Sequence, residues 1–573
     1  MATPETLDAL LARGEAARPA IAAPARAALD YASLRRQVAA TGETLSRLGV
    51  GRGDLVALVL PNGPEAATAF LGVAAHAASA PLNPAYTETE LAFYLDDLMP
   101  SLVLVEAGRG AAARRVAAAR GIRVAEVVAL AGAPAGVFEL RDAEQLDAPA
   151  DSGARGAAAL RDEETLRDGE ALRGGGAVRG GEASSASGGI ATPPALDRSS
   201  RAAPYADRPR DLALVLHTSG TTSRPKMVAL TAANLCASAA NVAESLALGP
   251  ADRCLGVMPL FHIHGLVAAV LASLHAGGSV FCAPGFNAMR FFSWLGESRA
   301  TWYTAVPTIH HAVLDRAPRN AGILERVRLR LVRSSSAALP PQVMARLEEV
   351  FHAPVIEAYG MTEAAHQMAS NPLPPRARKP GSVGVAAGPE VAIMDAAGHL
   401  LGPGETGEVV IRGPNVTAGY LGNAAATAAA FTDGWLRTGD QGSMDADGYL
   451  RLTGRLKEII NRGGEKISPR EVDETLLDHP AVAQVVTFAV PDEKLGEEVA
   501  AAIVLRDGAS ASEGEIRDFA RARLAPFKVP RRVVFLAEIP KGATGKLQRI
   551  GLAEKLGLAP PRGDSIRRTG SIA

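Results

Sequence analysis

At residues 217–226 the chain reads His-Thr-Ser-Gly-Thr-Thr-Ser-Arg-Pro-Lys, directly after the short apolar run Leu212 to Leu216. An apolar run of this length suits a buried strand. The glycine lets backbone approach a ligand closely, while hydroxyls and a lysine can bind phosphate oxygens. The stretch therefore predicts a polyphosphate-binding loop made of Thr218, Ser219, Gly220, Thr221, Thr222 and Lys226. It is not a Walker loop, and a Ser/Thr-rich turn before a helix is the alternative.

The sequence on both sides of this loop alternates helical and strand patterns. Leu55 to Leu60 and Leu102 to Val105 are strand candidates, and Ala66 to Ala80 is a helix candidate. Strands separated by helices indicate a mostly parallel α/β sheet with helical cover. Further along, polar segments such as Tyr359 to Glu363 follow short strands. Ligands bind at the carboxyl ends of strands in such sheets, so we expect the site there.

Composition restricts the class of protein. A chain of 573 residues is too long for one core, and 47% hydrophobic residues with a net charge of −1 describe an ordinary soluble protein. This charge balance favours neither nucleic acid nor an anionic membrane as a partner. No apolar run reaches the ~20 residues of a membrane span, and the N-terminal residues show no secretory-signal pattern. Three cysteines without metal-type spacing suit a reduced, cytoplasmic protein.

Changes in residue composition divide the chain into segments. Residues 150–206 repeat a six-residue Leu-Arg step and then become rich in Gly, Ser, Ala and Pro, which predicts a disordered insertion, either a passive linker or a partner-binding segment. We predict an N-terminal domain over 1–454, a small α+β C-terminal domain over 455–559, and a disordered tail over 560–573.

Five segments in order resemble the adenylate-forming superfamily of acyl-CoA synthetases, luciferases and nonribosomal adenylation domains. They are the phosphate loop from Thr218 to Lys226, the Tyr359 to Glu363 motif, Thr438-Gly439-Asp440, the hinge from Gly454 to Gly464, and Gly545-Lys546. The resemblance covers nearly the whole chain apart from the insertion and the tail. It implies a large N-terminal AMP-binding α/β domain of layered sheets and helices, with a small mobile α+β domain after it.

The resemblance also implies the reaction. A carboxylate attacks the α-phosphorus of ATP and expels pyrophosphate, so the site must neutralise charge and hold the anions in line. It implies that Glu363 binds Mg²⁺ and that Thr362 donates to the α-phosphate. Tyr359 and Gly360 would contact adenine, and Asp440 with Arg455 would bind the ribose. Lys546 and His262 are the remaining catalytic candidates.

Each of these residues also has a structural interpretation. Glu363 could be a favourable charge at a helix N-terminus, and Tyr359 could belong to the core. Asp440 could cap a turn, and Lys546 could be a surface lysine. Their order along one chain favours the functional interpretation.

In the second half-reaction the thiolate of CoA attacks the acyl-adenylate. The resemblance implies that the small domain swings about Lys457 and brings Gly463 and Gly464 to the CoA channel, where absent side chains permit close approach. A hairpin turn is the structural interpretation of the two glycines, and both can hold. Only a short polar tail follows Lys546, so we expect no carrier domain in the chain.

The acid is the least determined substrate. The positions that align with the acyl pocket of relatives are polar: His262, His264, Ser334, Ser335 and Ser336, with Arg333 beside them. Such side chains suit a short acid with a second polar group better than a fatty acid. A metal site at the two histidines is the alternative. The sequences of several stretches are most similar to the oxalate–CoA ligase branch of the superfamily. The alternative substrates are malonate and medium- or long-chain acids, and the alternative reaction is the loading of a carrier protein.

Overall fold

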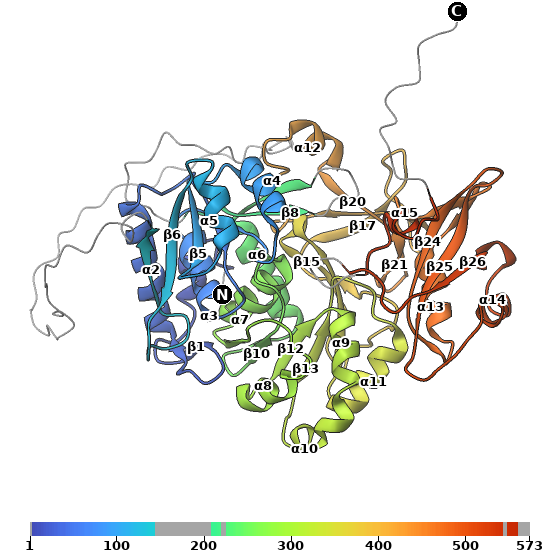
Figure 1. Ribbon diagram of the computed structural model, residues 1–573, viewed down its shortest axis with the longest axis horizontal. Coiled ribbons are helices and arrows are strands. Elements are labelled where there is room, and N and C mark those ends of the chain that lie inside the picture. The colour runs from blue at the N-terminus through green and yellow to red at the C-terminus, as the bar shows by residue number, and fades with distance from the viewer. Residues whose placement is uncertain (1–2, 144–207, 219–224, 542–546, 560–573) are drawn as a thin grey trace, which may run out of the picture.

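The computed structural model describes residues 3–143, 208–218, 225–541 and 547–559. The expected insertion at 150–206 and tail at 560–573 lie outside the described residues, as do Ser219 to Thr222 and Lys546. The described residues form four β-sheets with helices packed against them (Figure 1).

The first sheet has the strand order β7-β6-β5-β3-β4-β8-β9. Its strands are β3 (Leu55–Val59), β4 (Ala78–Pro81), β5 (Leu102–Glu106), β6 (Arg123–Ala129), β7 (Phe138–Asp142), β8 (Leu212–Thr218) and β9 (Lys226–Thr231). The nearby helices are α2 (Tyr31–Arg47), α3 (Pro64–Ala74), α4 (Glu88–Leu98) and α5 (Ala111–Ala118). The inner strands pair in parallel, and the edge pairs β6–β7 and β8–β9 are antiparallel.

Strand β3 explains why its sequence is apolar without alternation. Val56 and Leu58 belong to the core that contains α3, whereas Leu55, Ala57 and Val59 belong to the core that contains α4 and α5. Successive strand residues point to opposite faces, and helices cover both faces here. A continuous apolar run therefore marks the buried centre of the sheet.

The second sheet has the order β16-β15-β14-β13-β12-β10-β11-β1-β2. Its strands are β1 (Pro19–Ala22), β2 (Leu29–Asp30), β10 (Arg253–Gly256), β11 (Ser279–Cys282), β12 (Trp302–Ala305), β13 (Leu331–Ser334), β14 (Val355–Met361), β15 (His366–Ser370) and β16 (Val385–Ala386). Its helical elements are α1 (Leu7–Leu11), α6 (Ala232–Ser245), η3 (His264–Leu271), α7 (Ala272–His275), α8 (Phe291–Ser298), α9 (Pro307–Leu314), η4 (Ala317–Asn320), α10 (Ala321–Leu324), α11 (Pro341–Phe351) and η5 (Thr362–Ala364).

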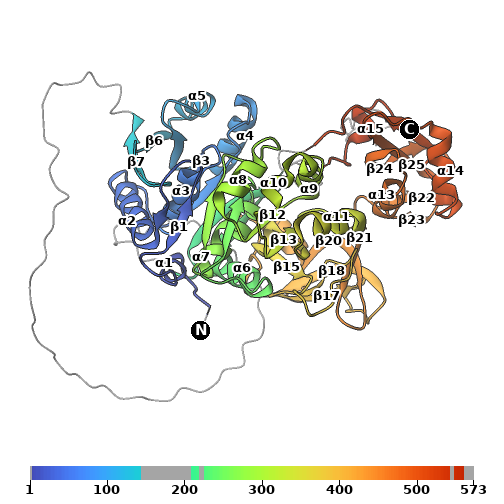
Figure 2. The same cartoon turned by 90° about the horizontal axis from the view of Figure 1, so that it is seen from below.

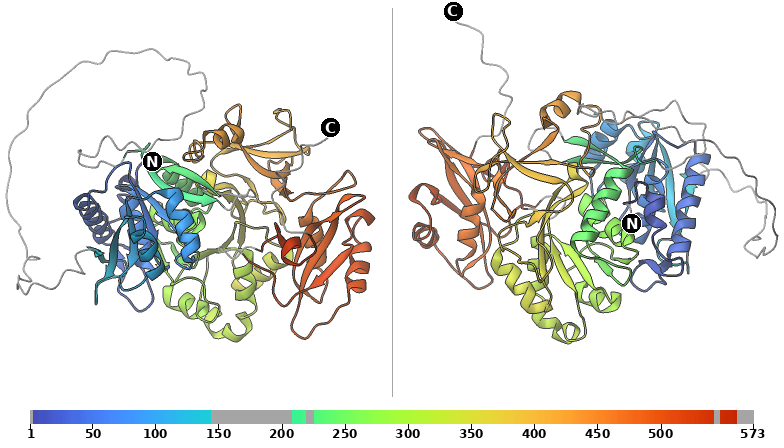
Figure 3. Two further views of the ribbon diagram at one scale, coloured as in Figure 1. Left: turned by 45° about the horizontal axis from the view of Figure 1, so that its top comes forward. Right: turned by 180° about the vertical axis from the view of Figure 1, so that it is seen from behind.

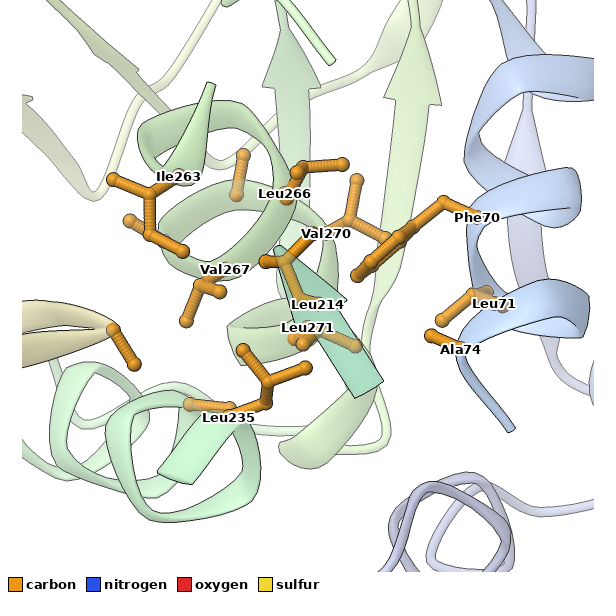
Figure 4. Close-up of a cluster of buried hydrophobic side chains, with 14 of the residues drawn as sticks. Phe70, Leu71, Ala74, Leu214, Leu235, Ile263, Leu266, Val267, Val270 and Leu271 are labelled. Carbon is orange, nitrogen blue, oxygen red and sulfur yellow. The ribbon is translucent and has the colours of Figure 1, made fainter. Parts of the chain in front are cut away.

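The main core fills the space between these two sheets. Figure 4 shows Val267 and Val270 of η3 between Leu235 of α6 and Phe70 of α3. All four side chains are fully or almost fully buried. All residues of η3 are buried, so its first residue, His264, is positioned by packing in this core.

The third and fourth sheets follow in sequence. The third has the order β17-β18-β20-β19, with β21 pairing with β20. It contains β17 (Glu390–Met394), β18 (Thr406–Arg412), β19 (Phe431–Thr432), β20 (Trp435–Met444), β21 (Leu450–Arg455) and the helix α12 (Ala424–Ala430). The fourth contains β22 (Ile460–Arg462), β23 (Glu465–Ile467), β24 (Val482–Asp492), β25 (Gly496–Leu505) and β26 (Arg532–Phe535), with α13 (Pro469–Leu477), α14 (Glu513–Arg521), η6 (Pro526–Lys528) and α15 (Leu552–Lys555).

The fourth sheet has a core of its own. Ile460, Val472 and Ile503 are fully buried in it. Figures 2 and 3 show this sheet and its helices at one end of the molecule. The chain enters it from β21 through residues 456–459, so a short segment, exposed at residues 456 and 457, joins the two parts.

One expectation about local structure was wrong. The helix expected from Ala66 to Ala80 ends at Ala74, and Ala78–Pro81 forms β4 instead. Alanine favours helix, but pairing of β4 with β3 in a buried sheet outweighs that small preference. The strands on the two sides of the phosphate loop pair in antiparallel, since β8 ends at Thr218 and β9 begins at Lys226.

Candidate active site

The end of β14 begins the candidate site. Gly360 lies at a register shift between β14 and β15, where a Cβ atom would lie 1.7 Å from the carbonyl oxygen of His366. Only glycine permits this close approach. The resulting bulge leads into η5, in which Glu363 is buried and Thr362 is half-buried.

Tyr359, Asp440 and Arg455 meet at one side of the site. The Tyr359 hydroxyl donates a hydrogen bond to Asp440 Oδ2, and Arg455 Nε lies 3.0 Å from Asp440 Oδ1. The backbone beside Asp440 is held by the neighbouring strand β18, whose Glu408 carboxylate accepts from the backbone N–H of Gly439 at 2.8 Å. The residues expected to bind adenine and ribose therefore share one surface, although β14 and β20 belong to different sheets.

Glu363 lies in a second group of contacts. Tyr420 donates its hydroxyl proton to Glu363 Oε1 at 3.0 Å, and Lys226 Nζ lies 4.4 Å from the centre of the Tyr420 ring. Burial raises the pKa of Glu363, and hydrogen bonds together with the charges of Arg455 and Lys226 partly offset this rise. Arg455 therefore faces both groups of contacts, and the two groups form one site.

Sequence reasoning missed Tyr420. The residue belongs to the loop 413–421, which is held against the site because the Thr417 N–H donates to the Glu363 carbonyl at 2.7 Å and the Asn415 amide donates to the Ala364 carbonyl at 2.8 Å. An aromatic residue after glycine in a polar loop, Gly419-Tyr420, was the available signal. Tyr420 and Glu363 are 57 residues apart in the sequence, so local sequence patterns could not predict their hydrogen bond.

The residues present fit Mg²⁺ in one particular way. Within the described ranges, no three His, Cys, Asp or Glu side chains come together as a metal-binding group. Mg²⁺ commonly takes one or two protein carboxylates and completes its shell with phosphate oxygens and water. The buried Glu363 carboxylate close to Lys226 suits an ion that arrives with ATP.

The phosphate loop is described at its two ends. Thr218 and Lys226 are paired across the hairpin, and the Thr218 hydroxyl donates to the Lys226 carbonyl at 3.4 Å. His217 is fixed by Asp97, whose Oδ2 lies 3.0 Å from His217 Nε2. The entrance to the loop is therefore anchored to α4. Ser219, Gly220, Thr221 and Thr222 between them, like Lys546, lie outside the described residues.

The expected acyl-pocket residues separate into two sets. His264 Nδ1 lies 3.1 Å from the Ser336 hydroxyl, His264 Nε2 lies 2.6 Å from the Thr304 hydroxyl, and the His366 ring packs edge-on at 4.9 Å. The Ser335 hydroxyl instead donates to the Ala358 carbonyl, and Ser334 is buried on β13. The three serines therefore do not share one set of contacts. We call His264, Thr304, Ser336 and His366 the polar cluster.

His262 lies one turn before the polar cluster. Its Nδ1 atom accepts a hydrogen bond from the backbone N–H of His264 at 3.2 Å, and its side chain is half-buried. This contact joins His262 to the first residue of η3. The role of His262 in catalysis stays a prediction.

The hinge and CoA-channel candidates lie around the fourth sheet. Lys457 is exposed in the turn between β21 and β22. Gly463 and Gly464 form the two-residue turn of the β22–β23 hairpin with φ of 59° and 97°. Two consecutive positive φ values are typical of such turns and explain the glycine pair locally. Their role toward CoA stays a prediction. None of the described helices is both long and apolar enough for a membrane crossing.

Comparison with known proteins identifies the class. The AMP-binding enzyme family model matches residues 11–421, and the AMP-binding enzyme C-terminal domain model matches residues 471–546. The chain therefore belongs to the AMP-binding enzyme family, and the resemblance drawn from its motifs is confirmed.

Within this family, the similar proteins are CoA ligases. An oxalate–CoA ligase of Arabidopsis thaliana is 44% identical over 89% of this chain and 90% of its own length. A probable CoA ligase, CCL9, of Humulus lupulus is 43% identical over 97% of each chain. The ATP-bound crystal structure of MatB from Rhodopseudomonas palustris superposes with a TM-score of 0.78 at 27% identity, covering 96% of this chain and 98% of that one. The protein is an ATP-dependent acyl-CoA ligase, whose substrates are a small-molecule acid, ATP and CoA, with Mg²⁺ as the cofactor.

Proposed function

We propose that this ligase activates oxalate and transfers the oxalyl group to CoA. The observation that carries the proposal is the polar cluster. His264 is fully buried, and its two ring nitrogens face the hydroxyls of Ser336 and Thr304. A fatty-acid tunnel would place apolar side chains here, because an acyl chain cannot satisfy buried polar groups. The 44% identity to an oxalate–CoA ligase supports the same substrate.

In the first half-reaction, one oxalate oxygen attacks the α-phosphorus of ATP while the bond to the β-phosphate breaks and pyrophosphate leaves. Asp440 and Arg455 hold the ribose, Tyr359 packs against adenine, and Lys226 with Thr218 binds the phosphates. Mg²⁺, when bound at Glu363, supplies charge neutralisation for the leaving pyrophosphate. Lys546 bridges the acid and the α-phosphate and stabilises the charge of the transition state.

In the second half-reaction, the thiolate of CoA attacks the adenylate carbonyl, a carbon–sulfur bond forms, and AMP leaves. We propose that residues 455–559 swing about Lys457 between the two steps. The turn at 456–459 is short and joins two separate cores, so a change of backbone angles there can move one core relative to the other. The swing would withdraw Lys546 and present the Gly463–Gly464 turn to CoA.

The cellular compartment and the rival substrates belong to the same proposal. All three cysteines are buried, which suits a reducing cytoplasm. Malonate and a medium- or long-chain fatty acid are the rival acids, and loading of a carrier protein is the rival reaction. Each rival would use the same nucleotide-binding residues, so only the acid and the acceptor discriminate between them.

A pyrophosphate-release screen tests the proposal. The purified chain is incubated with ATP and Mg²⁺, with and without CoA, and with oxalate, malonate, acetate, a coumarate or a fatty acid. We expect the highest kcat/KM with oxalate and formation of oxalyl-CoA by mass spectrometry. A preference of tenfold or more for any other acid of the panel would reject oxalate as the substrate while leaving the ligase class intact.

A further inference from the structure

Arg333 is one of the largest fully buried side chains of the molecule. It lies on β13, and none of its surface is exposed. Its Nη2 atom donates to Gln367 Oε1 at 2.9 Å and its Nη1 atom donates to the Thr304 hydroxyl at 3.3 Å, but its Nε atom has no hydrogen-bond partner among the described residues. A guanidinium with five donors is thus left incompletely satisfied.

The charge of Arg333 is also uncompensated. Within the part of the chain that the structure describes, it makes no ion pair, and the acidic group that acts on it is the thiol of Cys254. Burial lowers its pKa to about 9, so the side chain remains a cation at neutral pH. Buried charges are ordinarily paired, because their removal from water is costly. A buried cation that lacks an anion, in an enzyme whose substrate is an anion, indicates where the substrate's charge can be compensated.

The position of Arg333 connects it to the acyl site. In the sheet register, Arg333 lies opposite Thr304, and the Thr304 hydroxyl contacts both Arg333 and His264. His264 in turn contacts Ser336, three residues after Arg333. The guanidinium therefore adjoins the polar cluster on its inner side. The neighbouring strand β14 carries Tyr359, so the cluster lies beside the nucleotide site.

We propose that Arg333 is a specificity-determining residue, which selects acids that carry a second anionic group. The inference rests on the proposed function and deepens it, because it names the chemical class of the substrate: a short dianion. Arg333 supplies the positive charge, and the hydroxyl and imidazole groups of the polar cluster supply oriented hydrogen bonds. A monoanionic acid leaves the guanidinium unpaired, whereas a dianion pairs it.

Oxalate and oxamate form a matched pair of test substrates. Oxamate has nearly the same shape but carries a neutral amide in place of the second carboxylate. Pyrophosphate release with each acid gives a ratio of kcat/KM values, and loss of a desolvated charge pair predicts a wild-type preference for oxalate of about thirtyfold or more. We expect Arg333→Met to lower this ratio at least tenfold and Arg333→Lys to retain most of it.

Arg253→Met is the matched control variant. Arg253 begins β10 in the same sheet and donates to the Ser298 carbonyl and the Ser279 hydroxyl, away from the polar cluster. We expect its oxalate-to-oxamate ratio to equal that of the wild type. A merely structural role of Arg333 would lower kcat/KM for both acids equally, and this result would overturn the inference.

Two further measurements distinguish a failure of this inference from a folding defect and from a different substrate. Thermal unfolding without acid should give Arg333→Met a melting temperature no lower than the wild type, because the unpaired charge is gone. If that variant does not fold, Arg333→Gln, which also removes the charge, should lower the oxalate-to-oxamate ratio in the same way. If the wild type prefers another dianion, such as malonate, and that preference depends on Arg333, the proposed oxalate function fails while this inference stands. A wild type that prefers acetate or oxamate overturns the inference.

Discussion

Replacement of Tyr420 by phenylalanine tests the arrangement around Glu363. The substitution removes one hydroxyl and keeps the ring beside Lys226. The lost hydrogen bond joins Tyr420 to a carboxylate that is only 6% exposed, so water cannot easily replace it. A hydrogen bond to a charged group contributes about 1.5–3 kcal/mol, which corresponds to a loss of about 10- to 150-fold. We expect a loss of this size in kcat/KM for MgATP at neutral pH.

The same substitution should change the pH dependence in a known direction. The pKa of Glu363 is raised by burial, and the Tyr420 hydrogen bond opposes that rise by favouring the ionised form. Without the hydroxyl the pKa of Glu363 rises further, so less of the carboxylate is ionised at a given pH. The acidic limb of the pH profile should therefore move to higher pH, and added Mg²⁺ should partly restore activity.

Initial rates of pyrophosphate release across pH and Mg²⁺ concentration measure both effects. Tyr31→Phe is the matched control: its buried hydroxyl donates to the Gly278 carbonyl at 2.7 Å, so its removal costs about 1 kcal/mol of stability and should leave the pH profile unchanged. A Tyr420→Phe enzyme with kcat/KM within about twofold of the wild type and an unmoved acidic limb would refute the assignment of Glu363 and Tyr420 to the metal-binding end of the site.

Three further outcomes are expected. Burial raises the pKa of Glu357 from 4.5 to about 7, so the folded protein holds a proton that the unfolded chain releases, and stability declines as pH rises between these values. Relative to the wild type, Glu357→Gln should therefore be more stable by up to about 3 kcal/mol at pH 8 and by little at pH 4. Urea unfolding measures this difference, and equal midpoints of the two proteins at pH 8 would contradict the prediction. Gly360→Ala should lower the free energy of unfolding by more than about 2 kcal/mol, because the added Cβ would collide with backbone. Gly464 has φ of 97° and open space around its Cα, so Gly464→Ala should lower it by about 1–2 kcal/mol. Urea unfolding of both variants measures the two losses, and equal losses would contradict the packing argument. Lys546→Ala should lower adenylate formation by about 10²-fold or more but leave thioester formation from supplied acyl-adenylate intact, and unchanged overall turnover would remove Lys546 from the mechanism.

Sequence alone was sufficient for features that arise from local chemistry. Continuous apolar runs marked buried strands such as Leu55–Val59, because helices cover both faces of the first sheet. The order of the motifs established the AMP-binding enzyme family, since each motif reflects a contact with a ligand common to the family. That order also predicted that Tyr359, Glu363 and Asp440 belong to one site.

Tertiary structure decided what depends on distant partners. The helix expected to extend to Ala80 stops at Ala74, because strand pairing outweighs the helix propensity of alanine. Tyr420 reaches Glu363 through a loop whose path no local pattern encodes. An arginine in a sequence carries no sign of whether a carboxylate lies beside it. Burial and pairing of a charge are properties of the whole fold, and the structure places Arg333 in contact with Thr304 and Gln367 but with no carboxylate among the described residues.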